Sequence, residues 1–277
     1  MTPLQAVRKV AAELESAGVP SPRVDAEYLV GHIPGLSRTE LYCADRVLSE
    51  EEVRRLRFVQ ERRRAREPLA YILGEWGFRR LLLKVDRRAL IPRPETEVVV
   101  ERCLEHLRGL TAPRVLDVGV GSGAIALAIA DEHPGARVLG VDSSRRALSL
   151  AGENHALGGV DGRVELTHGH LLHGVDGPFA LVVSNPPYVR EAEFASLQPE
   201  IRLYEPYEAL VGEGLGEAVA RGALTALVPG AWLVLECGDG QAVDLAGGLR
   251  ALGYEDVRTT ADLAGRHRVV EGRLPRG

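Results

Sequence analysis

Asparagine, proline and tyrosine stand together at residues 185–188, directly after a short apolar run. Such a run, ended by a polar residue and two prolines, is typical of a buried strand that stops abruptly. The side-chain oxygen of Asn185 and the backbone carbonyl of Pro186 can each accept a hydrogen bond from a planar NH2 group. Pro187 stiffens the turn, and Tyr188 offers an aromatic face. This pattern indicates a grip on an amide or amino group, although a turn that only ends a strand has the same composition.

A glycine-rich loop lies upstream, in the run Gly119-Val120-Gly121-Ser122-Gly123. Glycine allows a tight turn and a close approach of backbone to ligand, and the amides that begin a helix favour an anionic group. The glycine spacing is one residue short of the dinucleotide-binding fingerprint. About 20 residues further on, Asp142 ends a second apolar run, where a carboxylate can bind both hydroxyls of a ribose. Capping of the next helix, together with Ser143 and Ser144, is the alternative role for Asp142.

These residues need a sheet to bring them together. From residue 114 onward the sequence alternates between strand and helix patterns, which predicts an α/β fold with a doubly wound, seven-stranded and mainly parallel sheet. Strands are expected near residues 114–118, 137–141, 162–167, 179–184, 231–236, 253–259 and 267–272, and helices near 123–132, 144–157, 214–227 and 240–251. The last two strands have no helix between them, so we expect an antiparallel edge. The glycine loop, Asp142 and Asn185 then lie at the carboxyl ends of three strands, where such sheets bind ligands.

Residues 1–67 predict a small helical bundle. Three features mark its helix starts: Thr2-Pro3, Ser21-Pro22 and a capping box of Ser49 with Glu52. The third of these helices ends in the basic run Arg62, Arg63, Arg64 and Arg66. The run predicts either a solvated helix end that complements the helix dipole or an electrostatic dock for RNA or an RNA-bound partner.

Residues 68–94 predict a linker hairpin with strands at 76–78 and 81–85 and a turn at Arg79-Arg80. Two prolines forbid helix before about residue 94, where the next helix should begin. The expected domains are therefore 1–67, 68–94 and 95–277. At the boundary between the second and the third, Arg93 and Glu95 either shape the mouth of a substrate site or form a local ion pair.

The totals exclude several classes of protein. A formal net charge of −5 over 277 residues argues against a general nucleic-acid coat. The three cysteines lie far apart, which indicates neither a disulfide framework nor a metal site and favours a cytoplasmic location. No apolar run is long enough to span a membrane. We expect no metal, because five histidines show no fixed ligand spacing: His133, His155, His168, His170 and His173.

Taken together, the glycine loop, Asp142 and the Asn185 motif resemble the class I S-adenosylmethionine-dependent methyltransferases, and residues 185–188 resemble their signature for methylation of planar NH2 groups. Three further segments are similar to the family of peptide chain release factor glutamine N5-methyltransferases: residues 68–74, 90–97 and 204–210. The resemblance extends from about residue 68 to 272, and residues 91–97 are its most specific segment.

The resemblance implies methyl transfer from S-adenosyl-L-methionine, with S-adenosyl-L-homocysteine as product, to the glutamine of a Gly-Gly-Gln motif. Residues 119–123 would hold the methionine part of the cofactor, Asp142 its ribose, and residues 185–188 the glutamine amide, with Asn185, Pro186 and Tyr188 as catalytic residues. Leu171 would pack on the adenine, in a segment that lacks the acid often present in the family. The implied partner is a release factor, with no membrane, no direct nucleic acid and a monomeric enzyme.

Three other functions remain open from the residues. An N6-adenine DNA or RNA methyltransferase uses a similar motif, but it would be expected to carry a basic recognition module. A cofactor-binding protein without catalysis would share the glycine loop and Asp142. An NAD-dependent enzyme would share them as well.

Overall fold

The computed structural model describes residues 1–160 and 162–276. Contacts divide the described chain into two compact units. One comprises Met1–Gly74 together with Gln198–Tyr204, and the other comprises the remainder of the chain from Glu75 onward. The sequence-based boundaries at 67/68 and 94/95 differ from this division, because residues 69–73 are a helix of the first unit and the hairpin that follows belongs to the second.

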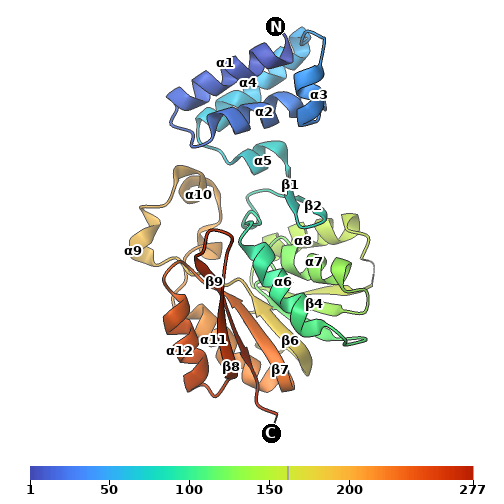
Figure 1. Ribbon diagram of the computed structural model, residues 1–277, viewed down its shortest axis with the longest axis vertical. Helices are drawn as coiled ribbons and strands as arrows, with labels where there is room; N and C mark the ends of the chain where they lie inside the picture. Colours follow the sequence, from blue (N-terminus) through green and yellow to red (C-terminus); the bar gives the residue numbers. More distant parts are fainter. Residues whose placement is uncertain (161, 277) are drawn as a thin grey trace. The chain divides into compact units, whose positions relative to one another are not determined.

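The first unit is all helical (Figure 1). Its helices are α1 (Pro3–Ser16), α2 (Pro22–His32), α3 (Arg38–Cys43), α4 (Glu50–Arg64), α5 (Leu69–Leu73) and α10 (Pro199–Tyr204). The capping box of Ser49 with Glu52 is confirmed, and Thr2 forms another with Gln5. Ser21 and Pro22 begin α2 as predicted, although the Ser21 side chain makes no capping hydrogen bond. The apolar stripes of α1 and α2 form the centre of one buried cluster.

All four arginines of the basic run at the end of α4 form ion pairs. Arg63 is 4% exposed and bonds to Asp25 at 2.7 Å and to Glu200 of α10 at 2.9 Å. Arg66 bonds to the same Glu200 at 2.7 Å. The two other arginines of the run pair with glutamates nearby in the sequence: Arg62 with Glu67, and Arg64 with Glu61. Neither a fully solvated helix end nor a free basic dock describes this run, because its central arginine is buried by residues from distant parts of the sequence.

The second unit has the predicted seven-stranded sheet, with strand order β5-β4-β3-β6-β7-β9-β8. The strands are β3 (Arg114–Val118), β4 (Arg137–Asp142), β5 (Val164–His168), β6 (Phe179–Ser184), β7 (Leu227–Glu236), β8 (Glu255–Ala261) and β9 (His267–Arg273). Only β9 runs antiparallel to its neighbours β7 and β8, which confirms the predicted edge. β7 starts at Leu227, before the predicted residue 231.

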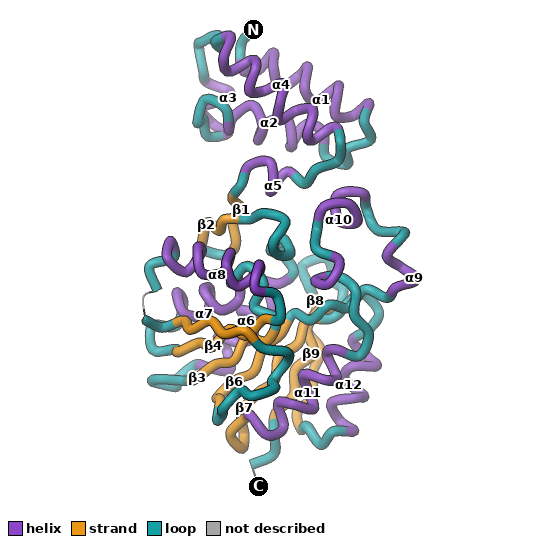
Figure 2. The backbone as a smooth tube through the Cα atoms, turned by 180° about the vertical axis from the view of Figure 1, so that it is seen from behind, coloured by secondary structure: helices purple, strands orange, loops and turns teal. Residues whose placement is uncertain are grey.

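Helices cover both faces of this sheet (Figures 1 and 2). The cluster on one face contains α6 (Thr96–Leu107) and α7 (Ala124–Glu132), with Leu148 of α8 (Arg145–Leu157) packed against it. The cluster on the other face contains α11 (Leu215–Ala226) and α12 (Ala242–Ala251). Successive residues of β3 belong to different clusters: Val115 to the first and Leu116 to the second. Strands buried on both faces carry the near-continuous apolar runs from which they were predicted.

The short elements differ most from the sequence prediction. The hairpin is confirmed, as β1 (Glu75–Phe78) and β2 (Leu81–Lys84). The sequence patterns predicted none of α3, α5, α9 (Glu191–Phe194), α10 and the 3-10 turn Tyr207–Ala209. Elements of three to six residues are too short to establish an apolar period, which explains the omission. No helix of the described chain combines the length and apolar character that crossing a bilayer requires.

Candidate active site

A cavity of about 270 Å³ lies beside the carboxyl ends of β3, β4 and β6. Nine of the residues expected from the sequence to bind cofactor or substrate line it: Gly119, Val120, Gly121, Ser122, Asp142, Leu171, Asn185, Pro186 and Pro187. The parallel register explains the convergence, because Val118 pairs with both Val141 and Ser184 and all three strands therefore end at one level. The structure thus brings the glycine loop and the Asn185 motif to one cavity.

The glycine loop adopts a conformation that other residues rarely tolerate. Gly119, Gly121 and Gly123 have φ angles of 77°, 57° and 88°, in the left-handed region that favours glycine. The backbone N–H groups of Gly119 and Val120 both donate to the carbonyl of Val141, at 2.8 and 3.0 Å, which ties the loop to β4. Gly123 caps α7 and lies outside the cavity lining.

Asp142 lines the cavity, and each oxygen of its carboxylate already accepts one hydrogen bond. One oxygen accepts the N–H of Gly121 at 2.8 Å, and the other accepts the N–H of Ser144 at 2.8 Å. The cap of α8 is Ser144, whose hydroxyl accepts from Ala147 N–H. Ser143 lines the cavity and does not cap the helix. Because each carboxylate oxygen has about two acceptor sites, Asp142 retains acceptor capacity toward a diol.

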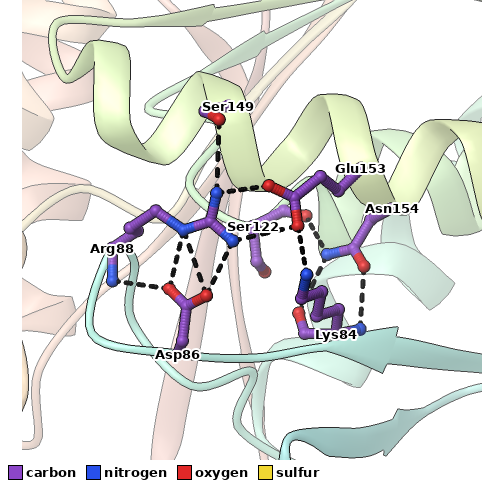
Figure 3. Close-up of polar contacts among 7 residues, drawn as sticks. All are labelled: Lys84, Asp86, Arg88, Ser122, Ser149, Glu153 and Asn154. Carbon is purple, nitrogen blue, oxygen red and sulfur yellow. Dashed lines mark hydrogen bonds and ion pairs between the residues drawn. The ribbon is translucent and has the colours of Figure 1, made fainter.

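Asn154 is hydrogen-bonded to the glycine loop through the carbonyl of Ser122 (Figure 3). This side chain is 1% exposed and donates to the carbonyls of Ser122 at 2.9 Å and Lys84 at 3.0 Å. Its oxygen accepts the N–H of Lys84 at 2.7 Å. One buried amide therefore connects α8, the loop and β2, and such a fully bonded group is costly to remove.

Ion pairs attach the stretch after β2 to α8. Arg88 pairs with Asp86 at 2.7 Å and with Glu153 of α8, donates to Ser149, and shares Glu153 with Lys84 (Figure 3). Two hydrogen-bonded cations lower the pKa of Glu153 to about 2, with Arg88 the larger cause. The residues that follow, from Arg88 to Arg93, line the cavity. The stretch that the sequence analysis assigned to a linker therefore forms one wall of the site.

Glu205 joins that wall to the segment after α10. Its carboxylate accepts the backbone N–H of Ile91 at 3.1 Å and pairs with the guanidinium of Arg93. Glu95 instead pairs with Arg266, at 3.2 Å. The local Arg93–Glu95 pair considered from the sequence is therefore wrong, and each residue is bound to a distant partner.

The residues of the Asn-Pro-Pro-Tyr motif line two neighbouring hollows. Asn185 lines the cavity, Pro186 and Pro187 line both hollows, and Tyr188 lines only the second, between that motif and α12. The Tyr188 carbonyl accepts from the amide of Gln241 at 2.9 Å, and burial raises the pKa of its phenol to about 12. Tyr188 is therefore a neutral group at physiological pH.

Leu171 lines the cavity with a φ of 52°, which is unusual for a residue other than glycine. Its neighbour His170 lines the cavity as well. Backbone strain of this kind is found at ligand-binding positions. The segment supplies an apolar contact and an imidazole, and no carboxylate.

Three buried polar residues near the site carried no role in the sequence analysis. Asp117 is 1% exposed and accepts from Ala126 N–H at 3.1 Å, and burial, with a smaller contribution from Asp142, raises its pKa to about 7. Thr96 and Glu236 lie behind Asn185 and are hydrogen-bonded to each other at 2.7 Å. Thr96 belongs to residues 91–97, the most specific segment of the family resemblance, and this membership could have marked it as a candidate site residue. Glu236 ends an apolar strand and could have been found by analogy with Asp142 and Asn185.

The described chain holds no cluster of three or more His, Cys, Asp or Glu side chains arranged to bind a metal ion. What the cavity offers is a neutral acceptor pair at Asn185 and Pro186, a carboxylate at Asp142 and a wall of backbone at the glycine loop. That set of groups suits a ligand that carries both a diol and a planar amide.

Comparison with known proteins identifies both units. The PrmC N-terminal domain model matches residues 5–74, and the methyltransferase small domain model matches residues 96–205. The release factor glutamine methyltransferase of Deinococcus radiodurans is 45% identical over 272 residues, covering 96% of each chain. Its counterpart from Caulobacter vibrioides is 40% identical, covering 94% of this chain and 92% of the relative.

Solved structures agree with the fold. The hMettl16 catalytic domain, solved in complex with the MAT2A 3'UTR hairpin 6, superposes with a TM-score of 0.55 at 15% identity, covering 70% of this chain and 75% of that one. The ribosomal protein L11 methylase of Lactobacillus delbrueckii gives a TM-score of 0.50 at 21% identity, with 68% and 81% covered. At these identities the likeness shows the methyltransferase fold alone. The sequence matches carry the family: this chain is a methyltransferase and belongs to the release factor glutamine methyltransferases.

Proposed function

We propose that this protein transfers a methyl group from S-adenosylmethionine to the side-chain amide nitrogen of the glutamine in the Gly-Gly-Gln motif of peptide chain release factors. The observation that carries the proposal is the shared cavity, which is lined by both the glycine loop and the Asn185 motif. The names of the relatives at 40–45% identity support the choice of substrate.

The residues present suit that cofactor. The carboxylate of Asp142 retains acceptor capacity for the two ribose hydroxyls. Gly119 and Gly121 are both at positive φ and carry no side chain. At these two positions the methionine part could therefore lie close to the backbone. Leu171 offers an apolar contact for the adenine. When bound, the cofactor supplies a methyl group that is already activated on a sulfonium.

The difficulty of the reaction lies in the acceptor, because an amide nitrogen shares its lone pair with its carbonyl. We propose that the Asn185 oxygen and the Pro186 carbonyl accept the two N–H hydrogens of the glutamine and so aim its nitrogen. Neutral acceptors stabilise the positive charge that develops on nitrogen in the transition state and leave no unpaired carboxylate in the empty site. The proton becomes acidic as the new bond forms, so these residues need not remove it beforehand.

The internal ion pairs of the arginine run disfavour the alternative of a nucleic-acid methyltransferase, since Arg63 and Arg66 are bound to Glu200. Incubation with methyl-labelled S-adenosylmethionine and either a purified release factor or duplex DNA separates the two functions. We expect label in the protein alone. Label in the DNA with none in the release factor would overturn the proposal.

A further inference from the structure

A buried chain of polar side chains leads from the cavity into the protein. Asn185, after β6, donates through its amide nitrogen to the Thr96 hydroxyl at 3.3 Å. Thr96, the first residue of α6, bonds in turn to Glu236, the last residue of β7, at 2.7 Å. Thr96 and Glu236 are 4% and 2% exposed. Three separate elements therefore contribute to one chain of hydrogen bonds.

The chemistry of the last member sets the direction of the whole chain. An ionised carboxylate can only accept, so the hydrogen of the Thr96 hydroxyl must point to Glu236. The Thr96 oxygen is then left to accept, and of the two ends of the Asn185 amide only the NH2 group can donate to it. The Asn185 oxygen is thereby directed away from Thr96.

We propose that Thr96 and Glu236 are positioning residues that fix the side-chain amide of Asn185 with its oxygen toward the methyl acceptor. The inference rests on the proposed function, in which that oxygen accepts an N–H of the substrate amide. A flipped Asn185 would present its NH2 group to the substrate NH2 group, and two donors cannot bond to each other.

Protonation of Glu236 would release this control. A protonated carboxyl can donate to Thr96, whose hydroxyl can then donate to the Asn185 oxygen, so that the flipped amide becomes equally acceptable. Burial raises the pKa of Glu236 to about 7, and the hydrogen bond from Thr96 opposes that rise. Turnover should therefore rise with pH through about 7 as the carboxyl ionises.

Several charged and polar groups face Glu236. Arg268 on β9 lowers its pKa, Glu95 at the start of α6 raises it, and a side-chain hydrogen bond from the Asn185 amide, beside the one from Thr96, lowers it. Tyr188 and Cys237 also interact with it, and both are neutral near pH 7, because burial raises their pKa values to about 12 and about 11. Arg268 is itself paired with Asp262 at 3.4 Å.

The chain offers a direct probe of the Asn185 amide. Asn154 and Asn185 are the only asparagines in the sequence, so labelling with side-chain 15N-asparagine gives two NH2 signals, which N154A assigns. We expect the Asn185 signals to shift between pH 5.5 and 8.5 with a midpoint near 7, and the shift to vanish in E236Q. Signals that do not titrate, or that titrate identically in E236Q, would overturn the inference whether or not the release factor is the substrate.

Kinetics with a release factor provide the second readout. T96V, which cannot relay the hydrogen bond, should lower kcat about 10-fold or more with little change in the Kd for S-adenosylmethionine. The conservative T96S should restore turnover to within about 2-fold of wild type. E236Q should lower kcat several-fold and remove the rise near pH 7. Equal losses in T96S and T96V would indicate a packing role and contradict the inference.

Two neighbouring charges test the same point without touching the chain of hydrogen bonds. E95Q removes a negative charge and should move the midpoint of the wild-type profile to lower pH. R268Q removes a positive charge and should move it to higher pH. Shifts in the opposite directions, or none, would show that Glu236 is not the group that titrates. A wild-type enzyme that fails to methylate release factors would refute the proposed function. The NMR titration of Asn185 would then still test this inference, because it does not depend on the substrate.

Discussion

Asn185 is the residue on which the proposed chemistry depends. Replacement by alanine removes one of the two acceptors for the substrate amide and leaves Asp142 and the glycine loop intact. We expect N185A to lower kcat by roughly 100-fold, as for other lost transition-state hydrogen bonds, while the Kd for S-adenosylmethionine changes by less than about 3-fold. Single-turnover kinetics and calorimetry on the same preparation measure the two effects. Turnover equal to wild type would refute the role of Asn185.

Asp117 makes a separate prediction about stability. Its folded pKa of about 7 lies above the ordinary value near 3.9. The folded state therefore binds an extra proton between these values, and the stability that this group contributes is lost as pH rises toward 7. An asparagine at this position stays neutral at every pH. We expect the stability of D117N relative to wild type to be more favourable at pH 8 than at pH 5, by on the order of 2 kcal/mol.

Urea unfolding at the two pH values measures this difference. D117E, which keeps an ionisable group at the position, serves as the comparison and should retain the pH dependence. A D117N variant whose stability relative to wild type is the same at pH 5 and pH 8 would show that Asp117 does not titrate between them.

At the scale of elements, Asn154 couples α8 and β2 to the cofactor loop (Figure 3). N154A leaves the Lys84 and Ser122 backbone groups without their buried partner, which should cost about 2–3 kcal/mol of stability. The loosened loop should also bind S-adenosylmethionine several-fold less tightly. Calorimetry and thermal unfolding measure both. S149A is the matched control on the same helix, because Ser149 is exposed and its hydroxyl accepts from Arg88 at 3.2 Å. Equal effects of the two variants would contradict the coupling.

The elements that hold the site were largely predictable, and the contacts between them were not. Strand positions follow from runs such as residues 179–184, because strands buried on both faces must be apolar throughout. The ends of these strands then place Asp142 and Asn185 together. The pairings of Arg93 with Glu205 and of Thr96 with Glu236 join residues 112 and 140 positions apart. Local pattern carries no information on such pairs, so the sequence offered only a neighbour, Glu95, as a partner for Arg93.

At the scale of the whole molecule, the first unit is completed by a segment from far along the chain. Glu200 of α10 binds both Arg63 and Arg66 of the α4 region. Removing one partner of a buried pair leaves an uncompensated charge. We expect E200A to lower the opening free energy of α4 by roughly 3 kcal/mol, as measured by native-state hydrogen exchange.

Glu61 supplies the control for that experiment. It pairs with Arg64 on the same helix, but both side chains are exposed. E61A should change the exchange of α4 by less than about 0.5 kcal/mol. Indistinguishable exchange in E200A and E61A would mean that α10 is not needed to stabilise the helical unit.

The most direct test of the proposed function is the position of the transferred methyl group. A release factor is treated with this enzyme and S-adenosylmethionine, digested, and sequenced by tandem mass spectrometry. We predict one added methyl, on the side-chain nitrogen of the glutamine in the Gly-Gly-Gln motif, and its accumulation about 100-fold more slowly with N185A. A methyl group on any other residue, or a release factor of unchanged mass, would contradict the proposal that Asn185 and Pro186 hold a glutamine amide for transfer.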